Sequence, residues 1–308
     1  MLRYNIFAKK TVTVLLFCLI TTFIFVGGCA AKKVHAMPFY NLNPKDITLR
    51  AQFYTTYEKS SEERKSNILL AAKSIDNYLI DVGGEFSFNR VVGARTEKRG
   101  YKTAKIIVDG EFVDGVGGGV CQVSSTLYNA ALLAGLSVTE YHPHSLPVSY
   151  VSPSFDAMVN SGSADLRFVN NTLNPVYIKT NADGKTLSIQ IYGEPLTVKY
   201  VRESVITGEV PCPEDEILYD DNLEYPDLYE GEKTILKYGK AGYKSEGYLV
   251  TMQGDRVLSR KKIRSDKYNS TRSVVLYGRA VKEEILPPEI DFPQQSLDLL
   301  DLLKLLFL

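Results

Sequence analysis

The sequence predicts an α+β protein in which a β-rich first domain with two main helices precedes a smaller all-β module. Residues 47–57 alternate in polarity like a half-buried strand, and Glu62–Ile80 places apolar residues along one helical stripe. From residue 200 to 281 the chain is polar and strand-patterned, is interrupted by glycines and lacks a convincing helix. Its 308 residues suffice for about two domains of roughly 150 residues each.

Short strands and one further helix complete the first domain. The Asp-Gly pair at 109–110 suits a tight hairpin between two short strands. Small and apolar residues over 124–134 predict the second helix, which Ser124 or Ser125 can cap and Gly135 can end. Four later segments, broken by Pro, Asn and Gly, are typical of strands: "LSVTEYHPHSLPVSYV", "ADLRFVN", "PVYIKTNA" and "TLSIQIYG".

Residues 1–36 form a targeting segment. A positively charged flank precedes the apolar run Thr11–Val26, which is shorter than the ~20 residues of a membrane-spanning helix. The "VGGC" that follows resembles a bacterial lipoprotein signal and makes Cys29 the candidate lipidation site. An uncleaved N-terminal anchor and cleavage after Ala36 are the alternatives. All three place the remainder outside the cytoplasmic membrane, and the first two anchor it there, facing the cell wall.

Neither the charge balance nor the C-terminal tail indicates a further function. Lys plus Arg equals Asp plus Glu, at 36 each, so no net field attracts nucleic acid. The tail, residues 282–308, ends in an apolar stretch that is too short to span a bilayer. No chemistry is assigned to it.

Cys121 is the strongest candidate for chemistry. It follows a glycine-rich turn at or just before a helix N-terminus, where the helix dipole lowers a thiol pKa and favours the thiolate. Gly118 and Gly119 allow close approach of a substrate, and backbone N–H groups there, or the neighbouring Gln122 side chain, can stabilise an oxyanion. A bridge to Cys212 stays open, as does a buried Cys121 that is merely a small apolar residue.

Histidine supplies the candidate base. His142 and His144 lie two residues apart in "YHPHS", so both imidazoles can face the thiol from an extended segment. Asp156 or Asp165 can orient the ring. Zinc binding by Cys121 and the two histidines is the alternative, but the spacing is not that of a closed structural site and a fourth ligand is not evident. We therefore expect no metal and no other cofactor.

Four ordered segments of the first domain carry a family resemblance: "GGEFSFNRVVGARTEKRGYKTAKIIVDGEFVDGVGGGVCQVSSTLYNAALLAG", "HPHSLPVSYV", "FDAMV" and "DLRFVNNT". Over residues 46–195 they closely resemble the VanW family of bacterial exported proteins. The resemblance implies an L,D-transpeptidase that cross-links peptidoglycan stem peptides through an acyl-enzyme on Cys121. In the family pattern the histidine before a serine is fixed, so His144 is the first choice of base and His142 the alternate, with Ser145 as a candidate substrate-binding residue.

Residues 200–281 resemble the so-called G-five domain, a glycine-punctuated β module of cell-wall proteins that is proposed to bind N-acetylglucosamine-containing glycan. The resemblance is strongest over "YEGEKTILKYGKAGYKSEGYLVTMQGDRVLSRKKI" and "SVVLYGRA". The expected partners are therefore peptidoglycan stem peptides and glycan, with the membrane contacted through the N-terminal segment.

The resemblance implies the following acyl transfer. The Cys121 thiolate attacks the carbonyl between the third and fourth residues of a stem peptide, and His144 protonates the departing D-alanine. An amine from a neighbouring stem then resolves the thioester. If water does so instead, the enzyme is a carboxypeptidase. The alternative from another class is a non-catalytic wall-binding lipoprotein that recognises stem peptides or glycan.

Overall fold

A computed structural model describes residues 47–108 and 110–282. The predictions for the targeting segment (1–36), for lipid on Cys29 and for the tail beyond Lys282 lie outside these residues. Within the described residues, no helix combines the length and the apolar character needed to cross a membrane.

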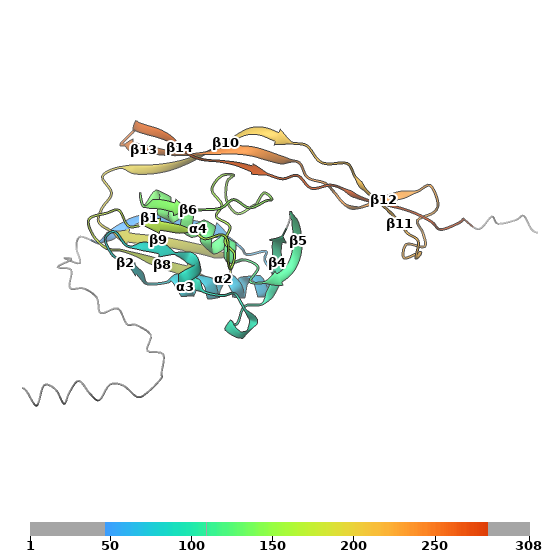
Figure 1. Ribbon diagram of the computed structural model, residues 1–308, viewed down its shortest axis with the longest axis horizontal. Coiled ribbons are helices and arrows are strands. Elements are labelled where there is room, and N and C mark those ends of the chain that lie inside the picture. Colours follow the sequence, from blue (N-terminus) through green and yellow to red (C-terminus); the bar gives the residue numbers. More distant parts are fainter. Residues whose placement is uncertain (1–46, 109, 283–308) are drawn as a thin grey trace, which may run out of the picture. The chain divides into compact units, whose positions relative to one another are not determined.

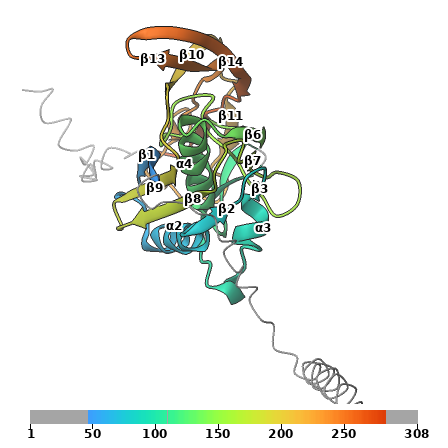
Figure 2. The same cartoon turned by 90° about the vertical axis from the view of Figure 1, so that its left-hand side faces the viewer.

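The centre of the first domain is a four-stranded antiparallel sheet with two main helices packed on it (Figure 1). The strand order is β1 (Thr48–Thr56), β9 (Thr186–Gly193), β8 (Val176–Ala182) and β2 (Tyr78–Ile80). Helices α2 (Glu62–Ile75) and α4 (Val120–Leu133) contact the sheet and each other, and Figure 2 shows them crossing. Alternate residues of β8 and β9 are fully buried in this core, as expected for strands with one apolar face: Ile178, Leu187, Ile189 and Ile191.

Smaller elements surround this core. A three-stranded sheet has the order β3 (Glu85–Ser87), β7 (Arg167–Val169) and β6 (Ser137–Glu140), and the short helix α3 (Phe88–Val92) follows β3. A 3₁₀ turn, η2 (Glu97–Arg99), leads to the hairpin of β4 (Thr103–Val108) and β5 (Glu111–Val116), as the Asp-Gly pair predicts.

The second domain is all-β over residues 200–282, which confirms the predicted fold class. The long strands β10 (Lys199–Val210), β13 (Gly242–Gln253) and β14 (Arg256–Tyr268) form an antiparallel sheet. In a second sheet, β15 (Val274–Tyr277) lies between β11 (Glu216–Tyr219), to which it runs parallel, and β12 (Lys233–Lys237). Figure 1 shows both sheets in yellow to red.

Three sequence-based boundaries are wrong, each for a local reason. The first helix ends at Ile75 rather than Ile80, because Asn77 adopts a left-handed conformation with φ 56° and the chain continues as β2. The second helix begins at Val120 rather than near Ser124, because Gly119 caps it with φ 107°. The segment from residue 136 to 151 is a strand only over β6.

Candidate active site

Cys121 lies in the first turn of α4, where the chain passes through a gap that admits only glycine. A Cβ on Gly118 would approach the Lys105 carbonyl oxygen to 2.7 Å, and one on Gly119 would approach an Ile68 side-chain carbon to 3.0 Å. Gly119 also has a left-handed backbone, which a larger residue would adopt only with strain. The turn is thus clamped between β4 and α2, and it fixes Cys121 at the helix N-terminus.

The backbone around Cys121 offers donors for an oxyanion. The N–H groups of Gly119 and Cys121 donate to no acceptor among the described residues. The Val120 N–H donates to the Gly117 carbonyl and the Gln122 N–H to the Gly119 carbonyl. Two of the amides in this turn therefore remain free to bind developing negative charge.

The Gln122 side chain does not play the predicted oxyanion role. Its amide nitrogen donates to the Thr55 hydroxyl at 3.1 Å and to the Thr56 carbonyl at 2.9 Å, while its oxygen accepts from Arg64 at 2.9 Å. Both amide hydrogens are thus occupied in a buried network. Gln122 joins α4 to β1 and α2 instead.

His144 and Asp156 form the pair that a triad requires. Both the main-chain N–H and the ring Nδ1 of His144 lie 2.7 Å from Asp156 Oδ2, and both side chains are at least 95% buried. Because the ionised carboxylate can only accept, Nδ1 carries the hydrogen and Nε2 is left for the Cys121 thiol. The thiol in turn lies 3.4 Å from the Val159 carbonyl oxygen.

The pKa values of the three groups favour a thiolate–imidazolium pair. Burial would raise the pKa of Cys121, but the hydrogen bond and charge of His144 hold it below its ordinary value, aided by the charge of Arg95. Burial would lower the pKa of His144, but hydrogen bonds to Asp156 and Cys121 raise it to about 9. Burial would raise the pKa of Asp156, but the hydrogen bond and charge of His144 keep it low.

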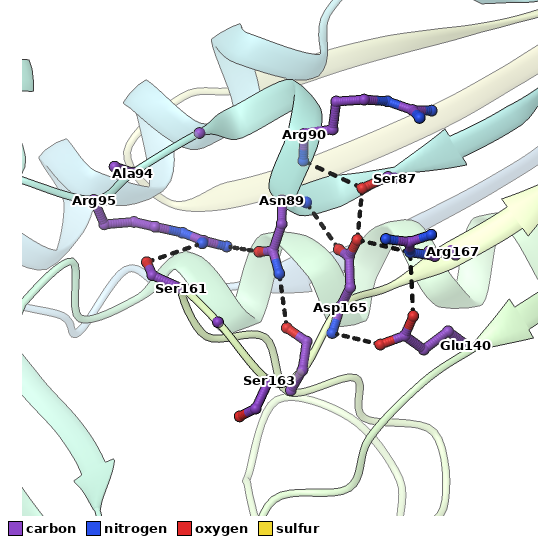
Figure 3. Close-up of a pocket in the computed structure, with 13 residues that line it drawn as sticks. Ser87, Asn89, Arg90, Ala94, Arg95, Glu140, Ser161, Ser163, Asp165 and Arg167 are labelled. Atoms are coloured by element: carbon purple, nitrogen blue, oxygen red, sulfur yellow. Dashed lines mark hydrogen bonds and ion pairs between the residues drawn. The ribbon is translucent and has the colours of Figure 1, made fainter.

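The other predicted partners lie elsewhere. His142 Nε2 pairs with Glu140 at 3.0 Å, and the side chain is partly exposed. Asp165 accepts from Ser87 in a separate polar cluster (Figure 3). Cys121 and Cys212 are both free cysteines, so the open alternative of a bridge between them is wrong. No three His, Cys, Asp or Glu side chains among the described residues are grouped to hold a metal ion, which leaves the zinc alternative without a ligand set.

Tyr150 is a site residue that the sequence did not single out. Its ring meets the His144 ring edge-on, with centroids 6.5 Å apart. Burial raises the pKa of Tyr150 well above its ordinary value, and the charge of Cys121 raises it further, so the phenol keeps its proton. Its segment was expected to be a strand, and an aromatic residue in a strand pattern gives no hint of this role.

Cys121 lines a cleft of about 1770 Å³, and both domains contribute residues to this cleft. The first domain contributes Cys121, His144 and Ser145, together with Tyr150 and the β4–β5 hairpin. The second domain contributes lysines and tyrosines: Lys237, Tyr238, Lys240, Tyr243 and Lys267. A smaller pocket of about 480 Å³ surrounds Asp165 and shares Arg95 with the cleft (Figure 3).

Comparisons with known proteins identify two domain types. Residues 63–192 match the family described as VanW like protein, and residues 203–280 match the G5 domain. The chain is 43% identical over 176 residues to "Uncharacterized protein YoaR" of Bacillus subtilis (strain 168), with 54% of this chain covered. It is 28% identical over 158 residues to "Vancomycin B-type resistance protein VanW" of Enterococcus faecalis (strain ATCC 700802 / V583), with 46% covered. Each match spans 58% of the relative's length.

Two solved structures match part of this chain. "Crystal structure of HP0197-G5" is 22% identical, with a TM-score of 0.15, and the match covers 26% of this chain and 97% of that one. "IgA1 Protease G5 domain structure" is 24% identical, with a TM-score of 0.19, and the match covers 27% and 90%.

The chain therefore contains a VanW-like domain followed by a G5 domain, in the order that the sequence motifs predict. This pairing indicates a cell-wall-associated protein.

Proposed function

We propose that the protein is an exported L,D-transpeptidase-like enzyme that remodels peptidoglycan stem peptides through an acyl-enzyme on Cys121. The observation that carries the proposal is the alignment of Cys121, His144 and Asp156 at a cleft, with the pKa of the thiol lowered and that of the imidazole raised. A nucleophile, a base and an orienting carboxylate are what cysteine acyl transfer needs.

Acylation uses the ion pair directly. The thiolate forms a C–S bond to the carbonyl carbon between the third and fourth stem residues, and the Cys121 N–H binds the oxyanion. The imidazolium then gives its proton to the departing amine nitrogen as the C–N bond breaks, which releases the fourth residue. Deacylation reverses the proton transfer: an acceptor amine gives its proton to His144, forms the new amide and frees the thiolate.

The cleft suits an anionic peptide. Arg64 and Arg95 of the VanW-like domain line it, and so do three lysines of the G5 domain. Opposite charges raise the local concentration of a peptide that carries carboxylates, as stem peptides do. The G5 domain, whose type is linked to cell-wall and glycan binding, would hold the enzyme near its substrate.

The proposal is tested with purified full-length chain and a disaccharide-tetrapeptide substrate, with products identified by mass spectrometry. We expect wild type and Cys212→Ala to release the fourth residue and form a cross-linked dimer, and Cys121→Ala to form neither. Release without a dimer would identify a carboxypeptidase. Equal products from Cys121→Ala and wild type, or none from either, would overturn the enzyme proposal and favour the non-catalytic wall-binding alternative.

A further inference from the structure

We propose that the G5 domain is a structural part of the active site, because strand β14 holds the carboxylate of Asp156 in place through Tyr268 and Arg264. Both are positioning residues, since they act on the thiol through Asp156 and His144. The inference rests on the proposed use of the Cys121 thiolate, but not on which amide bond that thiolate attacks.

The contacts of β14 with Asp156 are direct and buried. The Tyr268 hydroxyl donates to Asp156 Oδ1 at 2.5 Å and accepts from the Ser154 N–H at 2.8 Å. The Arg264 guanidinium donates to the Asp156 carbonyl at 2.6 Å and lies 3.4 Å from Oδ1. Tyr268 is 1% exposed and Arg264 is 4% exposed, so water does not replace these donors. Asp156 Oδ2 thus accepts from His144, and Oδ1 accepts from the G5 domain.

The Asp156 segment, residues 153–157, depends on both domains for its backbone hydrogen bonds. It belongs to no strand. On one side, α4 holds it: Asn129 donates to the Phe155 carbonyl at 2.7 Å, and Ser125 accepts from the Ala157 N–H at 2.9 Å. On the other side, Ser204 of β10 donates to the Pro153 carbonyl at 2.8 Å. Because buried backbone groups need partners, removal of either side would loosen this segment.

The G5 domain also fits too closely here to be a loosely tethered module. Ser154 and Ser245 hydroxyls lie 2.7 Å apart, and a Cβ on Gly247 of β13 would approach the Ser154 carbonyl oxygen to 2.9 Å. Arg202 of β10 stacks on Phe53 and Phe155, with its guanidinium carbon 4.3 and 4.8 Å from the ring centroids.

Charges around Asp156 make the role of β14 electrostatic as well as steric. Arg264 also donates to Asp266 at 2.6 Å, so it lies between two carboxylates. Tyr243 of β13 faces Asp156 as well. Burial and the neighbouring carboxylate of Asp156 raise the pKa of Tyr268, which therefore remains an O–H donor. A carboxylate that loses these donors is no longer held in line with the Nδ1–H of His144, so its hydrogen bond to the imidazolium weakens and the pKa of the imidazole falls.

The test measures the pH midpoint of Cys121 alkylation by iodoacetamide in the full-length chain, read by peptide mass spectrometry. The groups facing the thiol are His144, Arg95 and Tyr150. We expect Tyr268→Phe to raise the midpoint by about half a pH unit and to slow alkylation at pH 7 about threefold. The matched control is Tyr248→Phe on β13, which removes a hydroxyl that donates to Glu246 of the same strand and should leave the midpoint unchanged.

A second pair of variants covers the case in which Tyr268→Phe unfolds. Arg264→Lys keeps the charge but loses the forked contact with Asp156, so we expect a smaller rise of the midpoint in the same direction. Arg260→Lys lies on the same strand, breaks a forked pair with Glu203 and should leave the midpoint unchanged.

A double-mutant cycle separates positioning from general stability. If Tyr268 acts through Asp156, Tyr268→Phe should add no further shift in an Asp156→Asn background. A merely structural role would lower the melting temperature and leave the midpoint where it is, and that result, or additive shifts, would overturn the inference. Because alkylation needs no substrate, a shifted midpoint in a protein without transpeptidase activity would support this inference while the proposed function fails.

Discussion

Two buried aspartates, Asp156 and Asp165, lie close together in sequence but have different roles. Asp156 orients the imidazole of His144, whereas Asp165 holds a loop in place. Asp165 accepts from the Ser87 hydroxyl at 2.5 Å, from the Asn89 N–H at 2.8 Å and from Arg167 at 3.2 Å (Figure 3). All these donors belong to the VanW-like domain, and none is a titratable base next to a nucleophile. Asp165 therefore fastens its loop to β3 and α3.

Asp156 is also surrounded by donors, but one of them is the imidazole that reaches the thiol. A second donor is the main-chain N–H of the same histidine, and the others come from another domain, which Asp165 does not contact through any hydrogen bond in the described residues. Burial and hydrogen-bond count are thus similar at the two carboxylates. What separates a positioning carboxylate from a structural one is the chemistry of the group it orients.

The largest effect is expected at Asp156. In Asp156→Asn the imidazolium loses its charged partner, so we expect the rate of cross-linking to fall about a hundredfold or more. The pKa of His144 should fall and that of Cys121 should rise, which moves the midpoint of Cys121 alkylation to higher pH. An unchanged midpoint in a folded protein would remove the distinction between the two aspartates.

Asp165→Asn should give the opposite pattern. The buried Ser87 hydroxyl and the partly exposed Arg167 guanidinium lose a charged acceptor, so we expect the free energy of unfolding to fall by about 2 kcal/mol. Urea unfolding of the full-length chain measures this. The alkylation midpoint should match that of wild type, and a shift as large as in Asp156→Asn would show that the Asp165 cluster also governs the thiol.

Arg95 lines both the Cys121 cleft and the Asp165 pocket, and its substitution should have a moderate effect on Cys121 alkylation. It donates to Asn89 at 2.6 Å and to Ser161 at 3.4 Å in the Asp165 pocket, and its charge lowers the pKa of Cys121. In Arg95→Gln we expect alkylation at pH 7 to slow about threefold. Arg90→Gln is the control, because Arg90 lines the same pocket but donates to the Glu85 carbonyl. Equal rates of Cys121 alkylation in Arg95→Gln and Arg90→Gln would show that the charge of Arg95 does not lower the pKa of Cys121.

The smallest effect is expected at His142. Its ring pairs with Glu140, so His142→Gln should leave Cys121 alkylation and cross-linking within about twofold of wild type. His144→Gln should abolish cross-linking in the same assay. Similar losses in both variants would mean that the two imidazoles exchange roles.

The sequence alone could predict the site residues that belong to short, local sequence motifs. A cysteine after a glycine-rich turn points to Cys121, and two nearby histidines and a pair of aspartates give two candidates each for the base and the orienting carboxylate. The preference for His144 over His142 came from the family resemblance. The start of α4 was missed because a glycine cap carries no side-chain signal. The role of Gln122 was missed because its partners lie on β1 and α2.

Long-range packing accounts for the rest of the site. Tyr268 and Arg264 are more than a hundred positions from Asp156 and belong to another domain, so no local pattern connects them to it. The choice of Asp156 over Asp165 depends on the same packing. Domain order and fold class, by contrast, follow from periodicity and glycine spacing, which are local properties.

The central claim is that His144 stabilises the Cys121 thiolate, and the chain contains its own reference in the free, exposed Cys212. The most direct measurement is the pH dependence of iodoacetamide labelling at both cysteines in the full-length protein. The account predicts a midpoint for Cys121 about one pH unit or more below that for Cys212. Coincident midpoints, or labelling of Cys121 only after unfolding in denaturant, would contradict it.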